Sequence, residues 1–81
     1  MVTYNRIVKK KDGYVFELTV AQLDILKAYA EYGDRQMAAK KMNLKKGYVD
    51  SQMKIIKGTF FADTDSLALE RAVKFGFLDE G

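Results

Sequence analysis

The sequence contains neither cysteine nor histidine among its 81 residues. Disulfide bonds are therefore excluded, and so are zinc sites built from the usual cysteine and histidine ligands. Small domains often depend on such cross-links, because a chain of this length buries only about 60% of its unfolded surface. Stability must come from apolar packing, to which a dimer interface can add.

The sequence also lacks any apolar run that approaches the roughly 20 residues of a membrane-spanning helix. Arg6 and Lys9–Lys11 interrupt the apolar stretches near the N-terminus, where we find no signal-peptide core. With 48% hydrophobic and 12% aromatic residues, the composition is that of a folded domain. We expect a single domain over residues 1–81, located in the cytoplasm and without a membrane partner.

Catalytic signatures are scarce as well. Without histidine or cysteine, the few serines have no base at a suggestive spacing. Gly47 stands alone rather than within a glycine-rich phosphate-binding loop. We therefore expect no enzymatic activity, no cofactor and no metal ion.

Positive charge is concentrated in one part of the chain, although the net charge is only +3. Residues 1–34 are neutral overall, and residues 59–81 carry a net charge of −3. Residues 35–58, here called the cationic segment, carry seven lysines and arginines against one aspartate, a net charge of +6. Segregated positive charge of this kind is typical of a phosphate-binding surface.

A β-hairpin is predicted over residues 1–17. Strand-forming residues flank the turn Lys11-Asp12-Gly13, in which glycine can adopt a positive φ. They are Tyr4, Ile7 and Val8 before the turn and Tyr14, Val15 and Phe16 after it. The lysines near the tip can discourage pairing of the sheet edge or contact phosphates, and both interpretations stay open. An isolated hairpin is marginally stable, so its apolar side is expected to pack on helices.

A helical region is predicted over residues 18–78, followed by a tail at 79–81. The first helix begins with a capping box formed by Thr19 and Gln22, and it ends at Gly33. The last helix begins after short polar side chains at 63–65 that can accept hydrogen bonds from free amides, and Gly76 stops it.

The second and third predicted helices form the clearest motif. The second follows the cap Asp34 and extends over Arg35–Met42, and the third extends over about Lys46–Thr59. Only residues 43–45 join them. Two helices connected so tightly must cross at a steep angle, which is the geometry of a helix-turn-helix unit.

The third helix is amphipathic. Its apolar residues recur at i, i+4, i+7 and i+11 and form one stripe, namely Val49, Met53, Ile56 and Phe60. Gly47, Ser51 and Lys54 are expected on the opposite face. Asp50 and Lys57 are expected on one flank, with Tyr48 and Ile55 on the other. Gln52 is angled toward the stripe, which predicts a partly buried packing or capping role.

A spaced set of apolar and capping residues extends through all four predicted helices. It comprises Leu18, Thr19, Gln22, Ile25, Leu26, Ala30, Asp34, Ala38, Ala39, Met42, Leu44, Val49, Ile56, Phe60, Ala72, Gly76, Phe77 and Leu78. In order and spacing, and without a gap, this set resembles the LuxR/GerE-type helix-turn-helix domain. Along the third helix the family commonly has Ser, Thr, Lys and His where this chain has Lys45, Tyr48, Asp50 and Gln52.

The resemblance implies a mostly α fold, a four-helix LuxR/GerE-like domain preceded here by a short β-hairpin. It also implies a DNA-binding transcription regulator, cytoplasmic and nucleoid-associated, that inserts the helix at about 46–59 into the major groove of double-stranded DNA. A homodimer through the C-terminal helix is implied as well.

The candidate DNA-binding residues follow from this alignment and from charge. Phosphate contacts are expected from Lys45, Tyr48, Lys54 and Lys57, base-facing positions are Gly47, Asp50 and Ser51, Lys46 lies beside them, and accessory contacts are Arg35, Lys9, Lys10 and Lys11. An aspartate repels phosphates, so Asp50 must accept a hydrogen bond from a cytosine amino group or pair with a lysine such as Lys46, Lys54 or Lys57.

An alternative function is that of a protein-binding adaptor. In this interpretation a helix-turn-helix domain contacts another transcription factor or RNA polymerase instead of reading bases. The acidic Asp50 and the outward Tyr48 and Ile55 favour it, because exposed apolar and aromatic side chains are typical of protein interfaces.

Overall fold

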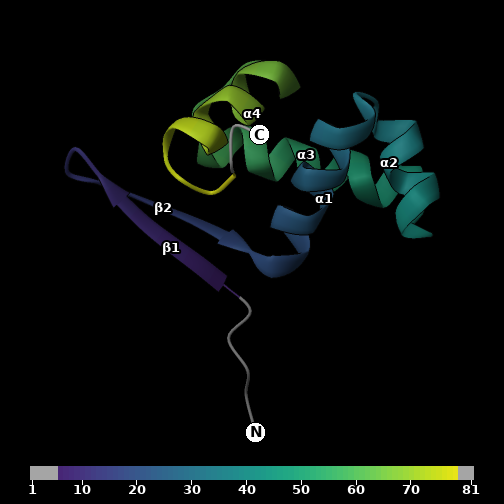
Figure 1. Cartoon of the computed structure of the whole chain (residues 1–81), viewed down its shortest axis with the longest axis horizontal. Coiled ribbons are helices and arrows are strands. Elements are labelled where there is room, and N and C mark those ends of the chain that lie inside the picture. Colours follow the sequence, from purple (N-terminus) through teal and green to yellow (C-terminus); the bar gives the residue numbers. More distant parts are fainter. Residues whose placement is uncertain (1–5, 79–81) are drawn as a thin grey trace, which may run out of the picture.

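The structure is a computed structural model that describes residues 6–78. An antiparallel hairpin precedes four helices, which hold 62% of the described residues (Figure 1). The elements are β1 (Arg6–Lys11), β2 (Tyr14–Thr19), α1 (Val20–Tyr32), α2 (Arg35–Met42), α3 (Lys46–Thr59) and α4 (Asp65–Lys74). The expected mostly helical fold with an N-terminal hairpin is confirmed. The predicted strand residue Tyr4 and the predicted tail at 79–81 lie outside the described residues.

The hairpin turns at Asp12 and Gly13, which both have positive φ, 53° and 82°. Two successive residues with positive φ are typical of the two-residue Asp-Gly turn. β2 extends to Thr19, so the predicted end of the hairpin at residue 17 is wrong. Thr19 has an extended backbone, which lets it end the strand while its side chain caps α1.

Three of the helices begin at polar caps in the predicted regions, and α1 ends at Gly33 as predicted. α4 begins at Asp65, within the polar residues predicted to precede it, and its C-cap is Phe75 rather than Gly76. Thr19 and Gln22 form the capping box, with both hydrogen bonds at 3.0 Å. Asp34 accepts from the Gln36 amide at 2.9 Å. Thr64 accepts from the Leu67 amide at 3.1 Å and so caps α4.

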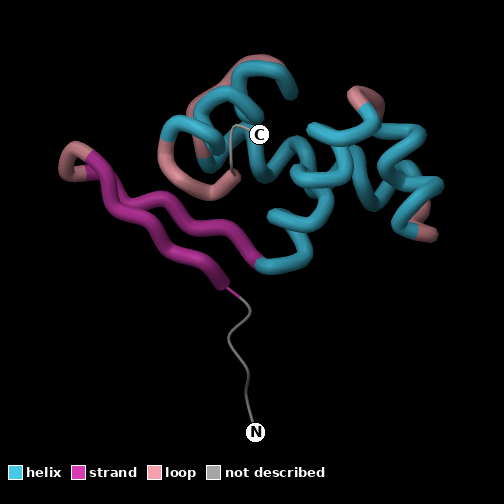
Figure 2. Tube along the Cα trace, viewed as in Figure 1, coloured by secondary structure: helices cyan, strands magenta, loops and turns pink. Residues whose placement is uncertain are grey.

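The link between α2 and α3 is as short as predicted. Asn43 takes the left-handed conformation, with φ 59°, in which glycine is the usual residue. The Leu44 amide donates to the Ala39 carbonyl at 2.8 Å, and the Leu44 side chain packs against the core. The chain therefore turns sharply and sets α3 across α2, as the tubes in Figure 2 show.

The core joins the hairpin to the helices. Its buried side chains come from β2, all four helices and the segments that follow α3 and α4: Phe16, Leu18, Leu23, Ile25, Leu26, Ala39, Val49, Met53, Ile56, Phe60, Ala68, Ala72 and Phe77. Phe16 stacks on Phe75 with ring centroids 4.1 Å apart, and on Phe60 at 5.8 Å. Ala30, which the family pattern places among the apolar positions, is exposed, and Tyr29 packs against the core instead.

Candidate functional site

α3 places its two faces as the sequence predicts. Val49, Met53 and Ile56 are fully buried, and Phe60 follows them into the core. Packing of this stripe turns the opposite side of the helix to solvent. We call the exposed residues of this side and of the helix start the α3 ridge: Lys45, Lys46, Gly47, Tyr48, Ser51 and Lys54.

The α3 ridge has little side-chain bulk at Gly47 and Ser51. Ser51 donates through its hydroxyl to the Gly47 carbonyl at 3.0 Å, so it lies flat on the helix. A Cβ built on Gly47 would meet no atom within 4 Å. No contact inside the described part of the chain therefore requires glycine at this position.

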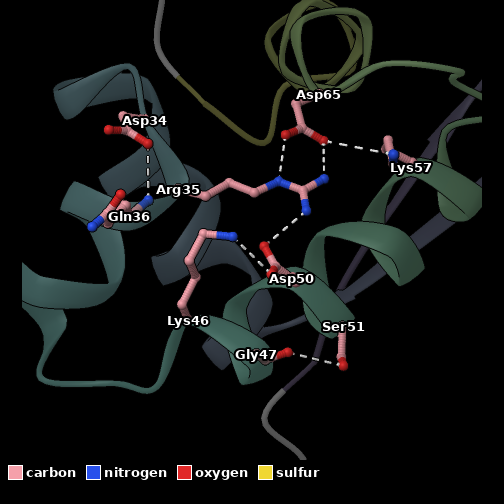
Figure 3. A network of polar contacts seen from close by, with 9 residues as sticks. All are labelled: Asp34, Arg35, Gln36, Lys46, Gly47, Asp50, Ser51, Lys57 and Asp65. Carbon is pink, nitrogen blue, oxygen red and sulfur yellow. Dashed lines mark hydrogen bonds and ion pairs between the residues drawn. The ribbon is translucent and has the colours of Figure 1, made fainter.

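A network of ion pairs lies beside the ridge and connects α2, α3 and α4 (Figure 3). Arg35 donates to both carboxylate oxygens of Asp65, from Nε at 2.5 Å and from Nη2 at 2.6 Å. Its Nη1 donates to Asp50 at 3.0 Å, and Lys46 donates to the other Asp50 oxygen at 3.0 Å. Lys57 Nζ lies 3.9 Å from Asp65.

The network shifts the pKa of its members. Hydrogen bonds from Lys46 and then from Arg35 hold the pKa of Asp50 below its ordinary value. Those from Arg35 lower the pKa of Asp65, although partial burial opposes the shift. The same contacts with Asp65 raise the pKa of Arg35 above its usual range. Both carboxylates are therefore ionised at neutral pH and held in fixed positions.

The network engages four predicted site residues inside the chain, namely Arg35, Lys46, Asp50 and Lys57. The side chains of Arg35 and Lys57 are only 24% and 26% exposed. The predicted pairing of Asp50 with Lys46 is present, whereas its pairing with Arg35 was not predicted. Among the ion pairs of residues 6–78, none includes Lys45 or Lys54. The cations of the ridge that stay unpaired are these two.

Gln52 fixes α3 against the first helix. Its side-chain oxygen accepts a hydrogen bond from the side-chain Nε2 of Gln22 at 3.1 Å, and the Gln22 side-chain oxygen also completes the capping box of α1. The predicted partly buried role of Gln52 is confirmed. The side chain thus positions the helix and points away from the ridge.

The lysines of the hairpin lie apart from the ridge. Figure 1 shows the hairpin tip and the α2–α3 link at opposite ends of the molecule. Lys9 and Lys11 stand opposite Phe16 and Tyr14 in the strand register, and Lys10 points to the other face of the sheet. The accessory lysines therefore form a second cationic region, separate from Lys45 and Lys54.

The chain has no match among protein-family models, curated proteins or solved structures. The LuxR/GerE-type identity therefore stays a prediction from the residues. Within residues 6–78, none of the helices combines the length and the apolar character needed to cross a bilayer.

Proposed function

We propose that the chain is a DNA-binding transcription regulator of the LuxR/GerE-like helix-turn-helix type. α3 enters the major groove, and the ridge lysines hold phosphates on either side of it. The observation that carries the proposal is the geometry of α3. Its buried stripe directs an exposed face with the unpaired Lys45 and Lys54, the small Gly47 and Ser51, and Tyr48 toward solvent.

The ion-pair network supports the proposal because it removes the main electrostatic obstacle. A free aspartate on a groove-facing helix would repel phosphates. The Asp50 carboxylate instead lies between Arg35 and Lys46, which neutralise it. The base-facing positions are then Gly47 and Ser51, and the phosphate contacts come mainly from Lys45, Tyr48 and Lys54.

The experiment measures binding of the chain to duplex DNA by fluorescence anisotropy at a series of salt concentrations. The logarithm of the affinity should fall linearly with the logarithm of salt concentration, with a slope of about −0.9 per phosphate neutralised. Lys54→Glu should weaken binding to all sequences and reduce the magnitude of that slope by about 1 or more. Selection of preferred sites from a pool of random duplexes then shows whether the chain recognises particular base sequences.

The matched control is Lys27→Glu, on the exposed side of α1 and outside the cationic segment. It makes the same charge change and should leave affinity nearly unaltered. Lys57→Glu is less informative, because a second carboxylate beside Asp65 would disturb the network as well as the surface. Equal losses with Lys27→Glu and Lys54→Glu would show a general charge effect and contradict the proposed site.

The proposed dimer forms through α4. Ser66, Leu69, Glu70, Val73 and Lys74 line a shallow hollow on this helix, in which Leu69 and Val73 lie one turn apart. Two copies joined there would present two α3 helices to half-sites about one turn of DNA apart. The stoichiometry of the DNA complex, measured in the same titration, tests this arrangement.

The second candidate function is the protein-binding adaptor. Ile55 and Tyr48 are 51% and 43% exposed on α3, which favours a protein partner over a polar groove. A complex with a transcription factor or RNA polymerase that is insensitive to salt and to Lys54→Glu, but lost with Ile55→Asp, would favour the adaptor.

A further inference from the structure

A groove lies between the hairpin and α4, away from the α3 ridge. It has a volume of about 480 Å³ and is lined by Tyr14, Phe16, Phe60, Phe61, Arg71, Lys74 and Phe75. Five of these seven residues are aromatic and the other two are cationic, with no carboxylate among them. A concave, mostly apolar site with a few charged groups at its edge is the usual form of a binding pocket.

Aromatic rings form the base and the wall of this groove. Phe16 and Phe75 stack at 4.1 Å with an angle of 15° between their planes, and Phe60 stacks on both at about 6 Å. Tyr14 and Phe61 at the edges are 61% and 73% exposed. The groove therefore combines a fixed apolar base with two aromatic side chains open to a partner.

Phe61 is held in a backbone conformation that rarely suits a bulky residue. Its φ is 54°, in the left-handed region. The Phe61 amide donates to the Gly58 carbonyl at 3.2 Å, and the Ala62 amide donates to the Lys57 carbonyl at 2.8 Å. This pair of bonds ends a helix at a position where glycine is the usual residue. Arg71 donates to the Phe60 and Phe61 carbonyls at 2.7 and 2.6 Å and holds the turn in place.

Packing of the Phe61 side chain does little to offset the strain of its backbone. A glycine would relieve the backbone strain, and a ring that is 73% exposed buries little apolar surface. Residues that break a local rule without a gain in stability are typical of functional positions. The exposed ring stands at the edge of the groove, so binding is the function that it can serve.

Positive charge surrounds the groove. Lys74 lines it directly. Lys9 and Lys11 are paired in register with Phe16 and Tyr14 and lie on the same face of the hairpin. All three lysines are exposed, and none takes part in an ion pair within residues 6–78. The groove is complementary to a ligand with an apolar centre and negative charge at its ends.

We propose that this groove binds an acidic peptide segment of a partner protein. An apolar side chain of the peptide enters between Tyr14 and Phe61, and its carboxylates pair with Lys9, Lys11 and Lys74. We infer a peptide rather than single-stranded nucleic acid because Phe16 and Phe75, the rings at the base of the groove, stack on each other and so do not offer their contacting faces to bases. This surface is additional to the proposed DNA-binding function and does not depend on it.

The experiment is a titration of the ¹⁵N-labelled full chain with a synthetic peptide in which one leucine is flanked by aspartates and glutamates. Amide shifts are expected at Tyr14–Phe16, Phe61–Ala62 and Lys74–Gly76, and not at Gly47–Ser51. A peptide with alanine in place of leucine, and one with lysines in place of its acidic residues, should each bind at least about tenfold more weakly.

The decisive variant is Phe61→Gly. Glycine relieves the backbone strain, so the Tm should rise by about 4–8 °C. Affinity for the acidic peptide should nevertheless fall at least about tenfold. Val15→Ala, on the outer face of β2, is the matched control and should leave the affinity unchanged. Lys54→Glu should also leave it unchanged, which separates this test from that of DNA binding.

Four results would overturn the proposal. Phe61→Gly could bind the peptide as well as the parent chain does. Its Tm could fall, which would assign the ring a structural role. Oligo(dT) could shift the groove amides while the peptide does not, which would make nucleic acid the ligand. The groove amides could shift with protein concentration alone, which would show that a second copy of the chain covers them.

Discussion

Substitutions at two glycines on the exposed side of α3 distinguish an effect on helix stability from an effect on DNA binding. Gly47 and Gly58 both have open space where a Cβ would lie. Alanine at either position should raise the free energy of unfolding, by up to about 1 kcal/mol, because glycine is a poor helix former. Only Gly47→Ala should weaken DNA binding, since its methyl group would stand on the ridge that approaches the duplex. Chemical denaturation and fluorescence anisotropy measure the two effects.

Gly58→Ala is the matched control for this comparison. It makes the same chemical change on the same face of the helix, but eleven residues further along and beyond Lys54, where the ridge ends. Equal DNA affinities for the parent chain and both variants would contradict a close approach of DNA to the Gly47 backbone. A lower stability of Gly47→Ala would contradict the helical conformation at the start of α3.

The ion-pair network connects three helices, and its contribution can be measured with one substitution. Arg35→Met keeps much of the side-chain volume but leaves Asp65 partly buried without its bidentate partner. We expect the free energy of unfolding at neutral pH to fall by about 1–3 kcal/mol. Arg6→Met is the control, because Arg6 pairs with Glu17 where both side chains are largely exposed, and such pairs contribute little.

The network also predicts how stability depends on pH. The pKa values of Asp50 and Asp65 are lower in the folded chain than the ordinary 3.8. Unfolding therefore raises them, and the unfolded chain binds more protons. The stabilising contribution is complete above about pH 5 and is lost as the pH falls through the folded pKa values. Thermal unfolding of Arg35→Met should depend less on pH in this range than that of the parent chain, and an unchanged dependence would contradict the assignment.

Local patterns predicted most of the elements, and long-range contacts could not be predicted from them. The caps Thr19, Asp34 and Thr64 and the stripe on α3 act over a few residues, so sequence spacing is sufficient. The pairing of Arg35 with Asp65 depends on how α2 and α4 meet, which no local spacing encodes. The ridge lysines were predicted from charge and from the family alignment, neither of which shows which cations are already paired within the chain.

Two further differences between the predicted and the observed structure have local causes that the residue types do not indicate. Thr19 serves both as the last strand residue and as a helix cap, so the predicted boundary of the hairpin falls too early. Phe61 takes a conformation typical of glycine, and its side chain gives no sign of it. The polar residues at 63–65 indicated the start of the last helix, but not the left-handed conformation of Phe61 before it. The groove beside Phe61 therefore could not be predicted from the sequence.

The hairpin belongs to the single core of the molecule and is not an appendage. Phe16 is buried against Phe60 and Phe75. Phe16→Ala should lower the free energy of unfolding by about 3–5 kcal/mol, which is most of the total free energy of unfolding expected of a domain of this size. Val15→Ala, on the exposed face of the same strand, should cost less than about 1 kcal/mol. Circular dichroism during urea denaturation would contradict this account if the helices of Phe16→Ala unfolded at the parent midpoint.

The stacking of Phe16 on Phe75 also bears on the order of events during translation. Within this chain the hairpin leaves the ribosome before the helices that cover its apolar face. A two-stranded hairpin is marginally stable alone in water, and the stack around Phe16 is complete only after Phe60 and Phe75 have both emerged. Products that end before Phe75 would lack one of the two rings that stack on Phe16, and the aromatic surface of β2 left exposed would be open to chaperones and proteases.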